Sequence, residues 1–348
     1  MTDSKQQGLI ISSATAAYAA HIDEQEEPDA DADIAAFELR EAVVAVQHHG
    51  QRLDVALVHV VPEFSRSYLQ QLVDVGAVQH NGRVQTKASA KVKAGDCLRI
   101  ELKPTPQSQA FKPEPMVLDV IYEDSHILVI NKPSGLVVHP APGNWSGTLL
   151  NGLLARDAQA FALPRAGIVH RLDKDTSGLM VVARTRQAMD QLVNMIAARS
   201  VNRQYTAFAH NAWHGAKTRQ VDYAVGRDVK NRLRMAVVDL AKNPGKSAST
   251  TITLLENGLD CCLVRCKLHT GRTHQIRVHM AAIGHCLLAD EIYGGKPAGG
   301  LHRQALHACE LAFDHPITGK HLRFKSPVSP DIQAALSHMG LSYNKALP

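Results

Sequence analysis

The chain has 348 residues, 45% of them hydrophobic, which is enough for two domains and a sizeable apolar core. It contains no run of eighteen apolar residues, which excludes a membrane-spanning helix. The net charge of +5 hides a division along the chain. Residues 1–45 carry ten acidic and two basic side chains, whereas the remainder carries 36 Lys and Arg against 23 Asp and Glu. A folded part this basic indicates a polyanionic partner such as RNA.

Residues 1–45 are predicted to form a disordered acidic tail, because they hold few aromatic residues and their second half is rich in acids. The mildly apolar stretch from Gly8 to Ala20 is interrupted by polar residues, so it is not taken as an export signal. The six cysteines form no CxxC pair, and three of them fall in one apolar run. Reduced thiols in a cytoplasmic protein account for this pattern.

Residues 50–103 show the pattern of a small module of two helices and a short sheet. One helix is predicted to begin at Arg52-Leu53-Asp54. A second begins after Ser65, a typical N-cap residue, and ends at Gly76. Asn81-Gly82 is typical of a two-residue hairpin turn between strands.

The order of these pieces (RLD, SRS, the VxxNG hairpin and a GD before the last strand) resembles the S4 RNA-binding domain. In the S4 family the helix pair grips RNA phosphates, which implies RNA contacts for Arg52 and Arg66. The other interpretation is a structural cap with surface arginines.

A proline-rich linker is predicted at 104–112, followed by a catalytic domain over 113–335. Helices are predicted over 147–155 and 186–198. Strands are predicted over 117–122, 126–131, 179–183, 204–209, 233–238, 249–255, 259–268, 305–313 and 322–325. Few connections have the length of a helical crossover, so the predicted fold class is α+β, with a mixed, largely antiparallel sheet and flanking helices.

The segment from Gly167 to Ala183 places Asp173 in a tight loop between apolar runs, with Arg171 two residues away. A rigid loop with an acid and a cation is suited to hold a nucleophile or a general base. The other interpretation is an aspartate satisfied by backbone N–H groups, with Arg171 in an ion pair inside the loop. Gly178 is predicted to permit the reversal of the chain into the next strand.

Two later segments carry further polar residues at element boundaries. Tyr205 opens a strand, with Arg203 two residues before it. Gly271 ends another strand, and the residues after it open a helix, whose N-terminus favours anions. His269, His274 and His279 do not have the HExxH spacing, and no cysteine pair accompanies them, so no metal site is predicted.

Together these segments resemble the RluA family of RNA pseudouridine synthases. The motifs are GIVHRLDKDTSG around Asp173, a basic-x-Tyr pair ending at Tyr205, and HQIRVH around Arg277. The loops NKPSGLVVHP and DEIYGG also match. The likeness covers roughly residues 50–335 and, with the S4 module, points to the RluC/RluD branch of the family.

The resemblance implies a role for each of these residues. Asp173 is the catalytic carboxylate, and whether it adds to a carbon or acts as a base is left open. Tyr205 stacks on the target uracil and moves a proton at C5, while Arg277 pairs with Asp173 and keeps it ionised. Arg171 fills the space left by the flipped base. The other predicted RNA-binding residues of the catalytic domain are His170, Arg272 and His274.

The implied substrate is a set of uridines in large-subunit (23S) rRNA, in the helix 69 stem-loop, either free or in a precursor of the large ribosomal subunit. The protein is expected to act as a monomer in the cytoplasm. It is expected to need no metal or small-molecule cofactor and to bind no membrane. One alternative is a non-catalytic S4-type RNA-binding protein. Another is an aspartyl phosphotransferase, because Asp173-Lys174-Asp175-Thr176 loosely matches a DxDxT nucleophile loop; that class needs magnesium and a later acidic pair.

Overall fold

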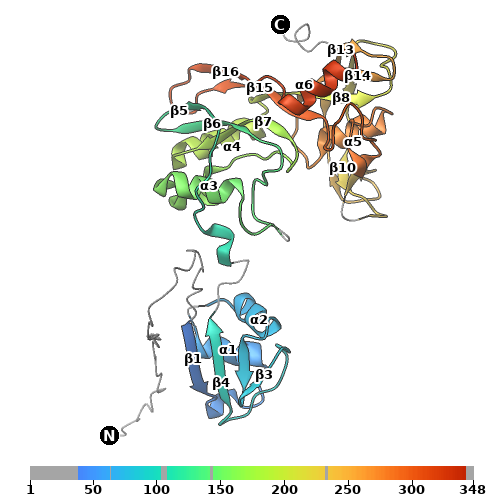
Figure 1. Ribbon diagram of the computed structural model, residues 1–348. Helices are drawn as coiled ribbons and strands as arrows, with labels where there is room; N and C mark the ends of the chain where they lie inside the picture. The colour runs from blue at the N-terminus through green and yellow to red at the C-terminus, as the bar shows by residue number, and fades with distance from the viewer. Residues whose placement is uncertain (1–37, 63, 103–107, 142–143, 232–233, 342–348) are drawn as a thin grey trace, which may run out of the picture. The chain divides into compact units, whose positions relative to one another are not determined.

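The structure, a computed structural model, describes residues 38–62, 64–102, 108–141, 144–231 and 234–341. The chain divides into two compact units, residues 1–110 and 111–348 (Figure 1). Residues 1–37 of the predicted tail, residue 103 of the predicted S4 module and residues 104–107 of the predicted linker lie outside the described residues. Ser108–Phe111, at the end of that linker, form a turn of 3-10 helix.

The first unit is a four-stranded antiparallel sheet with two helices packed on it, as the S4 likeness implies. Its elements are β1 (Glu38–Val43), α1 (Leu53–Val60), α2 (Arg66–Asp74), β2 (Val78–His80), β3 (Arg83–Val84) and β4 (Cys97–Leu102). The strand order is β1-β4-β2-β3. One apolar cluster joins the helices to the sheet and includes Leu57, Leu72 and Ile100, all fully buried. Ser65 caps α2, because its side chain accepts a hydrogen bond from the Tyr68 N–H.

The prediction of a disordered tail through residue 45 is wrong at its C-terminal end. Glu38–Val43 form strand β1, whose six residues pair with β4. Strand pairing uses backbone groups, so acidic side chains on an exposed edge do not prevent it. The acidic composition of residues 38–43 predicted disorder, but the backbone of β4 offers them a strand to pair with.

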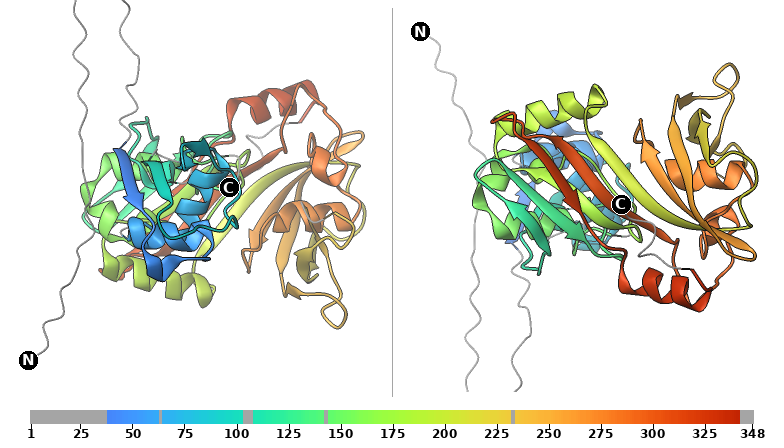
Figure 2. Two further views of the ribbon diagram at one scale, coloured as in Figure 1. Left: turned by 90° about the horizontal axis from the view of Figure 1, so that it is seen from below. Right: turned by 90° about the horizontal axis from the view of Figure 1, so that it is seen from above.

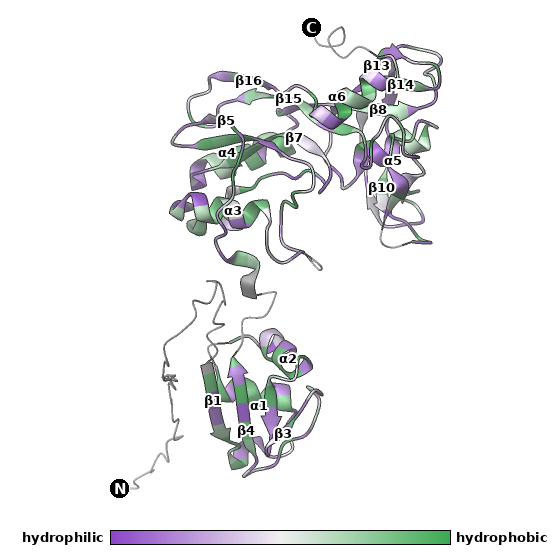
Figure 3. Ribbon diagram, viewed as in Figure 1, coloured by the Kyte–Doolittle hydropathy of each residue, from purple (hydrophilic) through white to green (hydrophobic). Residues whose placement is uncertain are grey.

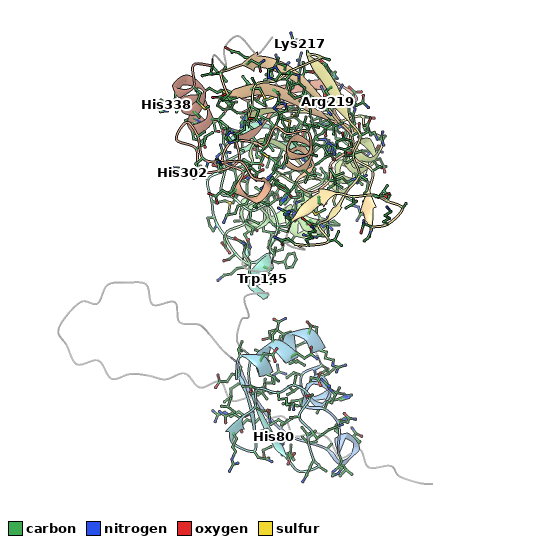
Figure 4. The ribbon with its side chains drawn as sticks, turned by 90° about the vertical axis from the view of Figure 1, so that its right-hand side faces the viewer. His80, Trp145, Lys217, Arg219, His302 and His338 are labelled. Atoms are coloured by element: carbon green, nitrogen blue, oxygen red, sulfur yellow. The ribbon has the colours of Figure 1, made fainter. Side chains whose placement is uncertain are left out.

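The predicted hairpin turn is present and is closed by Asp96. Asn81 and Gly82 both have positive φ, 51° and 75°, as a two-residue hairpin turn requires. The Asp96 carboxylate accepts a hydrogen bond from Asn81 Nδ2 at 2.9 Å and lies 2.6 Å from Nε2 of His80, which is labelled in Figure 4. The GD pair of the sequence therefore ties the start of β4 to the turn.

The second unit is built on one nine-stranded sheet (Figures 1 and 2). Its strands are β5 (Val120–Glu123), β6 (Ile127–Lys132), β7 (Ser177–Ala183), β8 (Asn202–His210), β9 (Thr218–Val221), β13 (Thr250–Asn257), β14 (Cys261–Leu268), β15 (Leu306–Asp314) and β16 (His321–Lys325). The order is β5-β6-β7-β15-β8-β14-β13-β9, with β16 on β15. Among the described strands only β7 and β15 pair in parallel. The predicted α+β class, with a mixed and largely antiparallel sheet, is confirmed.

Both faces of this sheet are covered, so its central strands are buried throughout. Helices α3 (Leu149–Arg156) and α5 (Gln275–Ala282) contribute to the apolar cluster on one face. Helices α4 (Arg186–Ala197) and α6 (Pro330–His338) contribute to clusters on the other face. Figure 3 shows the hydrophobic colour in the middle of the sheet, around β6 and β7. Burial on both sides explains the continuous apolar run that predicted β7.

Three features of this unit were not predicted. A small sheet forms from β10 (Val225–Arg227), β11 (Met235–Val237) and β12 (Gly245–Lys246), only one strand of which was expected. Helix α6 extends beyond residue 335, the predicted end of the domain. Gly178 lies inside β7 rather than at a reversal, and a Cβ there would collide with the Ala308 backbone. That glycine therefore permits the close approach of β7 to β15.

Edge strand β9 has an exposed cation, Arg219, and a second, Lys217, directly before its first residue. Lys217 and Arg219, both exposed, lie at the edge of the second unit in Figure 4. Charged side chains on an edge strand disfavour pairing with the strand of another molecule.

Candidate active site

The loop that carries Asp173 is held by two cations, the buried Lys132 and the partly buried Arg303. Lys132, at the end of β6, donates from Nζ to the carbonyl of Lys174 at 2.9 Å and to the carbonyls of Pro133 and Leu136. Arg303 donates from Nη1 to the carbonyl of Asp175 at 2.8 Å. The backbone is therefore fixed on the C-terminal side of Asp173, which orients the carboxylate before a substrate arrives.

Lys132→Met is expected to lower the free energy of unfolding by about 2 kcal/mol or more, because three carbonyls lose their donor. It should also lower kcat by about tenfold or more, since the Asp173 loop loses its anchor. Chemical denaturation and single-turnover kinetics measure the two effects. Lys174→Met, which removes an exposed ammonium from the same loop, should change stability by less than about 0.5 kcal/mol. Equal effects of the two substitutions would contradict the anchoring role.

Behind the loop, Ser177 Oγ and His307 Nδ1 form a buried hydrogen bond of 2.9 Å. Burial lowers the pKa of His307 to about 4. The unfolded chain therefore takes up a proton at about pH 6.5, which the folded chain accepts only near pH 4.

Stability is expected to fall as the pH falls from about 6.5 to about 4, by up to about 1.4 kcal/mol per pH unit for His307 alone. The half-buried His139 and His170, whose pKa values desolvation lowers to about 4 and about 3, add to this slope. Denaturation curves at several pH values measure it, and His307→Gln should flatten the curve. A slope that His307→Gln leaves unchanged would mean that this imidazole is not held neutral.

The Asp173 carboxylate is open to a cavity rather than engaged in its own loop. No backbone N–H of the described residues donates to it; its contacts are Arg277 Nη1 at 3.3 Å and His274 Nε2 at 3.9 Å. Its side chain is 17% exposed. Arg171 forms no ion pair with Asp173 or Asp175 and is exposed at the cavity. The loop-aspartate interpretation is therefore not supported.

Arg277, on the first turn of α5, makes the predicted contact with Asp173 but has a stronger partner. It binds Asp290 through Nε and Nη2, both at 2.7 Å, and the two side chains are 4% and 1% exposed. Its guanidinium also lies over the Tyr293 ring, 5.0 Å from the centroid. Burial lowers the pKa of Arg277, but Asp290 and Asp173 outweigh burial and raise it. Asp290 thus fixes the guanidinium so that Nη1 is presented to Asp173.

The cavity in front of Asp173 has a volume of about 430 Å³ and is lined by residues of the loop, β8 and α5. Tyr205 lines it on the sheet side, and burial raises its pKa to about 12. The phenol is therefore protonated at neutral pH. Five further arginines line the cavity: Arg165, Arg171, Arg199, Arg203 and Arg272. A cavity with one open carboxylate, one tyrosine and so many cations suits a polyanion that presents a planar group.

The comparisons with known proteins agree with this geometry. The model of the RNA pseudouridylate synthase family matches residues 126–282, and that of the S4 domain matches residues 51–97. A protein of Neisseria meningitidis named ribosomal large subunit pseudouridine synthase D is 45% identical over 311 residues, which cover 86% of this chain and 81% of the relative. The chain belongs to the RNA pseudouridylate synthase family.

Other relatives agree. The Xanthomonas campestris protein of the same name is 43% identical over 86% of this chain and 92% of its own length. The solved structure of human RNA pseudouridylate synthase domain containing 1 has a TM-score of 0.50 and 26% identity, covering 64% of this chain and 90% of that one. Human RNA pseudouridylate synthase domain containing 4 shares the fold, with a TM-score of 0.52, 24% identity and coverage of 64% and 94%.

The other predicted RNA-binding residues of the synthase unit also line the cavity. His274 has a positive φ of 55° at the start of α5, and a 2.8 Å hydrogen bond joins its Nδ1 and Tyr293 Oη. Burial lowers the pKa of His274, so its ring is neutral at pH 7. Arg272 donates to the Ser247 carbonyl at 3.1 Å. His170 uses Nε2 to accept the Val181 N–H, which makes it part of the scaffold as well.

In the S4 unit, Arg52 and Arg66 share one buried carboxylate. Asp54 accepts from Nε and Nη2 of both arginines and from Gln70. Burial raises the pKa of Asp54, but these hydrogen bonds outweigh burial and hold it well below its usual value. The Arg52 and Arg66 side chains remain 44% and 51% exposed. Asp54 therefore orders both cations at the surface, a role that the sequence did not reveal.

Three functional residues, Asp290, Lys132 and Arg203, carry no sequence signal that assigns them a role in the chemistry. The first two lie in motifs that matched the family, DEIYGG and NKPSGL, which was the available signal. The described residues contain no cluster of His, Cys, Asp and Glu able to hold a metal ion. None of the described helices is long and apolar enough to cross a membrane.

Proposed function

We propose that this protein isomerises specific uridines of large-subunit (23S) rRNA to pseudouridine. The observation that carries the proposal is the Asp173 carboxylate, which faces a basic cavity beside Tyr205 and Arg277. The substrate class is supported by relatives at 43–45% identity whose names specify the large ribosomal subunit. The likeness to the RluD branch points to the helix 69 stem-loop.

The reaction breaks the bond from ribose C1′ to uracil N1, turns the base, and rejoins it through C5. The target nucleotide is flipped out of its stack to enter the cavity. Asp173 acts on the ribose or the base, and Arg277 holds it in position. Tyr205 stacks on the uracil; since its phenol is protonated at neutral pH, we assign it stacking rather than proton abstraction. Arg171 takes the space that the base vacates.

RNA capture is divided between the two units in this proposal. Arg52 and Arg66 of the S4 unit bind phosphates away from the target, and His170, Arg272 and His274 contact RNA at the cavity. The enzyme acts as a monomer in the cytoplasm and needs neither a metal nor a cofactor, because isomerisation gains and loses no atoms or electrons.

Mapping pseudouridine in large-subunit rRNA tests the substrate. rRNA from cells that lack the gene should miss pseudouridine in helix 69, and the wild-type gene should restore it. Parallel reactions on protein-free rRNA and on precursor subunits then identify the form that is modified. Unchanged large-subunit rRNA, or loss of pseudouridine from another RNA alone, would contradict the proposed substrate.

A further inference from the structure

Arg203 is a buried cation for which the described residues provide no partner. It lies near the start of β8 and is 6% exposed. No described side chain or carbonyl accepts a hydrogen bond from its guanidinium, no described carboxylate pairs with it, and its Nε is buried without a partner. Arg277, equally buried, has two carboxylates instead.

An unpaired buried charge is costly, because it has lost water and gained no counter-charge. Such a group is retained where a bound ligand or a reaction intermediate supplies the missing charge. Arg203 lines the cavity, so a ligand or intermediate bound there would bring the missing negative charge next to its guanidinium.

Arg203 lies where the flipped uracil would bind rather than at the mouth of the cavity. Arg203 and Tyr205 are two residues apart on one strand, so they lie on the same face of the sheet, and both are 6% exposed. The charges of Arg203 and Asp173 both act on the Tyr205 hydroxyl, with opposite sign. A uracil stacked on Tyr205 therefore lies within reach of the guanidinium.

Gly271 packs against this guanidinium. A Cβ at position 271 would lie 2.8 Å from Arg203 Nη1, so a side chain there would displace the guanidinium from its present position. The backbone of the loop therefore lies directly beside the Arg203 side chain.

The proposed reaction creates a negative charge on the base. When the C1′–N1 bond breaks, its electron pair stays with uracil, and the charge spreads over N1 and the carbonyl oxygens. The C5–C1′ bond then forms, C5 loses its proton and N1 gains one, so atoms and electrons balance. A fixed cation beside a developing oxyanion lowers the barrier, because its orientation is set before the reaction.

We propose that Arg203 is a catalytic residue whose guanidinium binds the carbonyl edge of the target uracil and stabilises the departing base. This inference rests on the proposed function, since it concerns the base that Asp173 helps to release. A backbone phosphate is the competing ligand, but Arg165 and Arg199, which also line the cavity, are exposed and are therefore better placed for phosphates than the buried Arg203.

Arg203→Gln is expected to lower the single-turnover rate at saturating RNA by about 10²–10³-fold, the usual loss for one oxyanion donor. RNA affinity and its salt dependence should stay near wild type, and Arg203→Lys should recover part of the rate. The contrast variant Arg199→Gln should instead weaken RNA binding and lower the slope of log affinity against log salt by about one.

An RNA with 5-fluorouridine at the target separates stabilisation of the base from a structural role. Fluorine withdraws electrons, so the fluorinated base departs more easily and needs the guanidinium less. The loss of glycosidic cleavage in Arg203→Gln should therefore be several-fold smaller for the fluorinated RNA than for the uridine RNA. Should Arg203→Gln fail to fold, Gly271→Ala displaces the guanidinium without removing its charge and should show the same pattern more weakly.

Three results would overturn the inference while leaving the proposed function intact, because wild-type enzyme stays active in each. The first is an unchanged single-turnover rate in Arg203→Gln. The second is a weaker RNA affinity of Arg203→Gln with a salt slope lowered by about one. The third is an equal loss of glycosidic cleavage in Arg203→Gln for the uridine and the 5-fluorouridine RNA. The second result would make Arg203 a phosphate site. Wild-type enzyme that forms no pseudouridine in rRNA would instead contradict the proposed function itself.

Discussion

Asp173→Asn is expected to lower pseudouridine formation by about 10⁴-fold or more while RNA binding persists. The amide keeps the shape of the side chain but can neither carry the charge nor accept a proton. The carboxylate is the one that the loop leaves open to the cavity, 3.3 Å from Arg277 Nη1. Single-turnover kinetics and an RNA-binding titration on the same preparation measure the two quantities.

Asp175→Asn is the matched control, because it makes the same change two residues away in the same loop. The loop uses the Asp175 carbonyl, which Arg303 binds, and that carbonyl is retained in the variant. Its rate should stay within about tenfold of wild type, since a modest shift of the loop costs far less than loss of the reacting group. Similar losses in the two variants would mean that the loop as a whole, and not Asp173, is responsible.

Asp290→Ala is expected to destabilise the fold by about 3–5 kcal/mol, because it leaves the Arg277 guanidinium buried without its closest counter-charge. Both bonds of this pair are 2.7 Å long. The remaining contact to Asp173 is longer, so Arg277 should shift toward Asp173 or into the cavity. A displacement of this kind lowers kcat by about 10²-fold. Denaturation curves and single-turnover rates measure the two effects.

The exposed pair of Arg186 and Asp190, 2.9 Å apart on α4, provides the comparison. Asp190→Ala removes the same type of contact from solvent and should cost less than about 0.5 kcal/mol. If Asp290→Ala were as mild as Asp190→Ala, Asp290 could not be the residue that orients Arg277.

Local signals predicted local structure well. The Asn81-Gly82 turn and the Ser65 cap depend on a few neighbouring residues, and the structure has both. Strand β1 was missed because its stability comes from β4, more than fifty residues later in the chain. Gly178 was placed in a turn because nothing near it in the sequence indicates the backbone of Ala308.

In the active site too, contacts between residues distant in the sequence could not be predicted from local signals. Asp173 and Arg277 are 104 residues apart, and only the family resemblance brought them together in the sequence analysis. Asp290 was not predicted, because a carboxylate in a polar loop looks the same whether it faces solvent or a buried guanidinium. Arg203 was recognised as part of a motif, yet its lack of a partner among the described residues is a property of the folded cavity alone.

Release of tritium from uracil C5 provides the most direct test of chemistry at Asp173. C5 loses its hydrogen only when it bonds to the ribose, so tritium in the water reports the completed isomerisation. In the presence of EDTA, wild-type protein with C5-tritiated large-subunit rRNA should release tritium, and Asp173→Asn should release none above background. No release by the wild type, or equal release by both proteins, would contradict this mechanism.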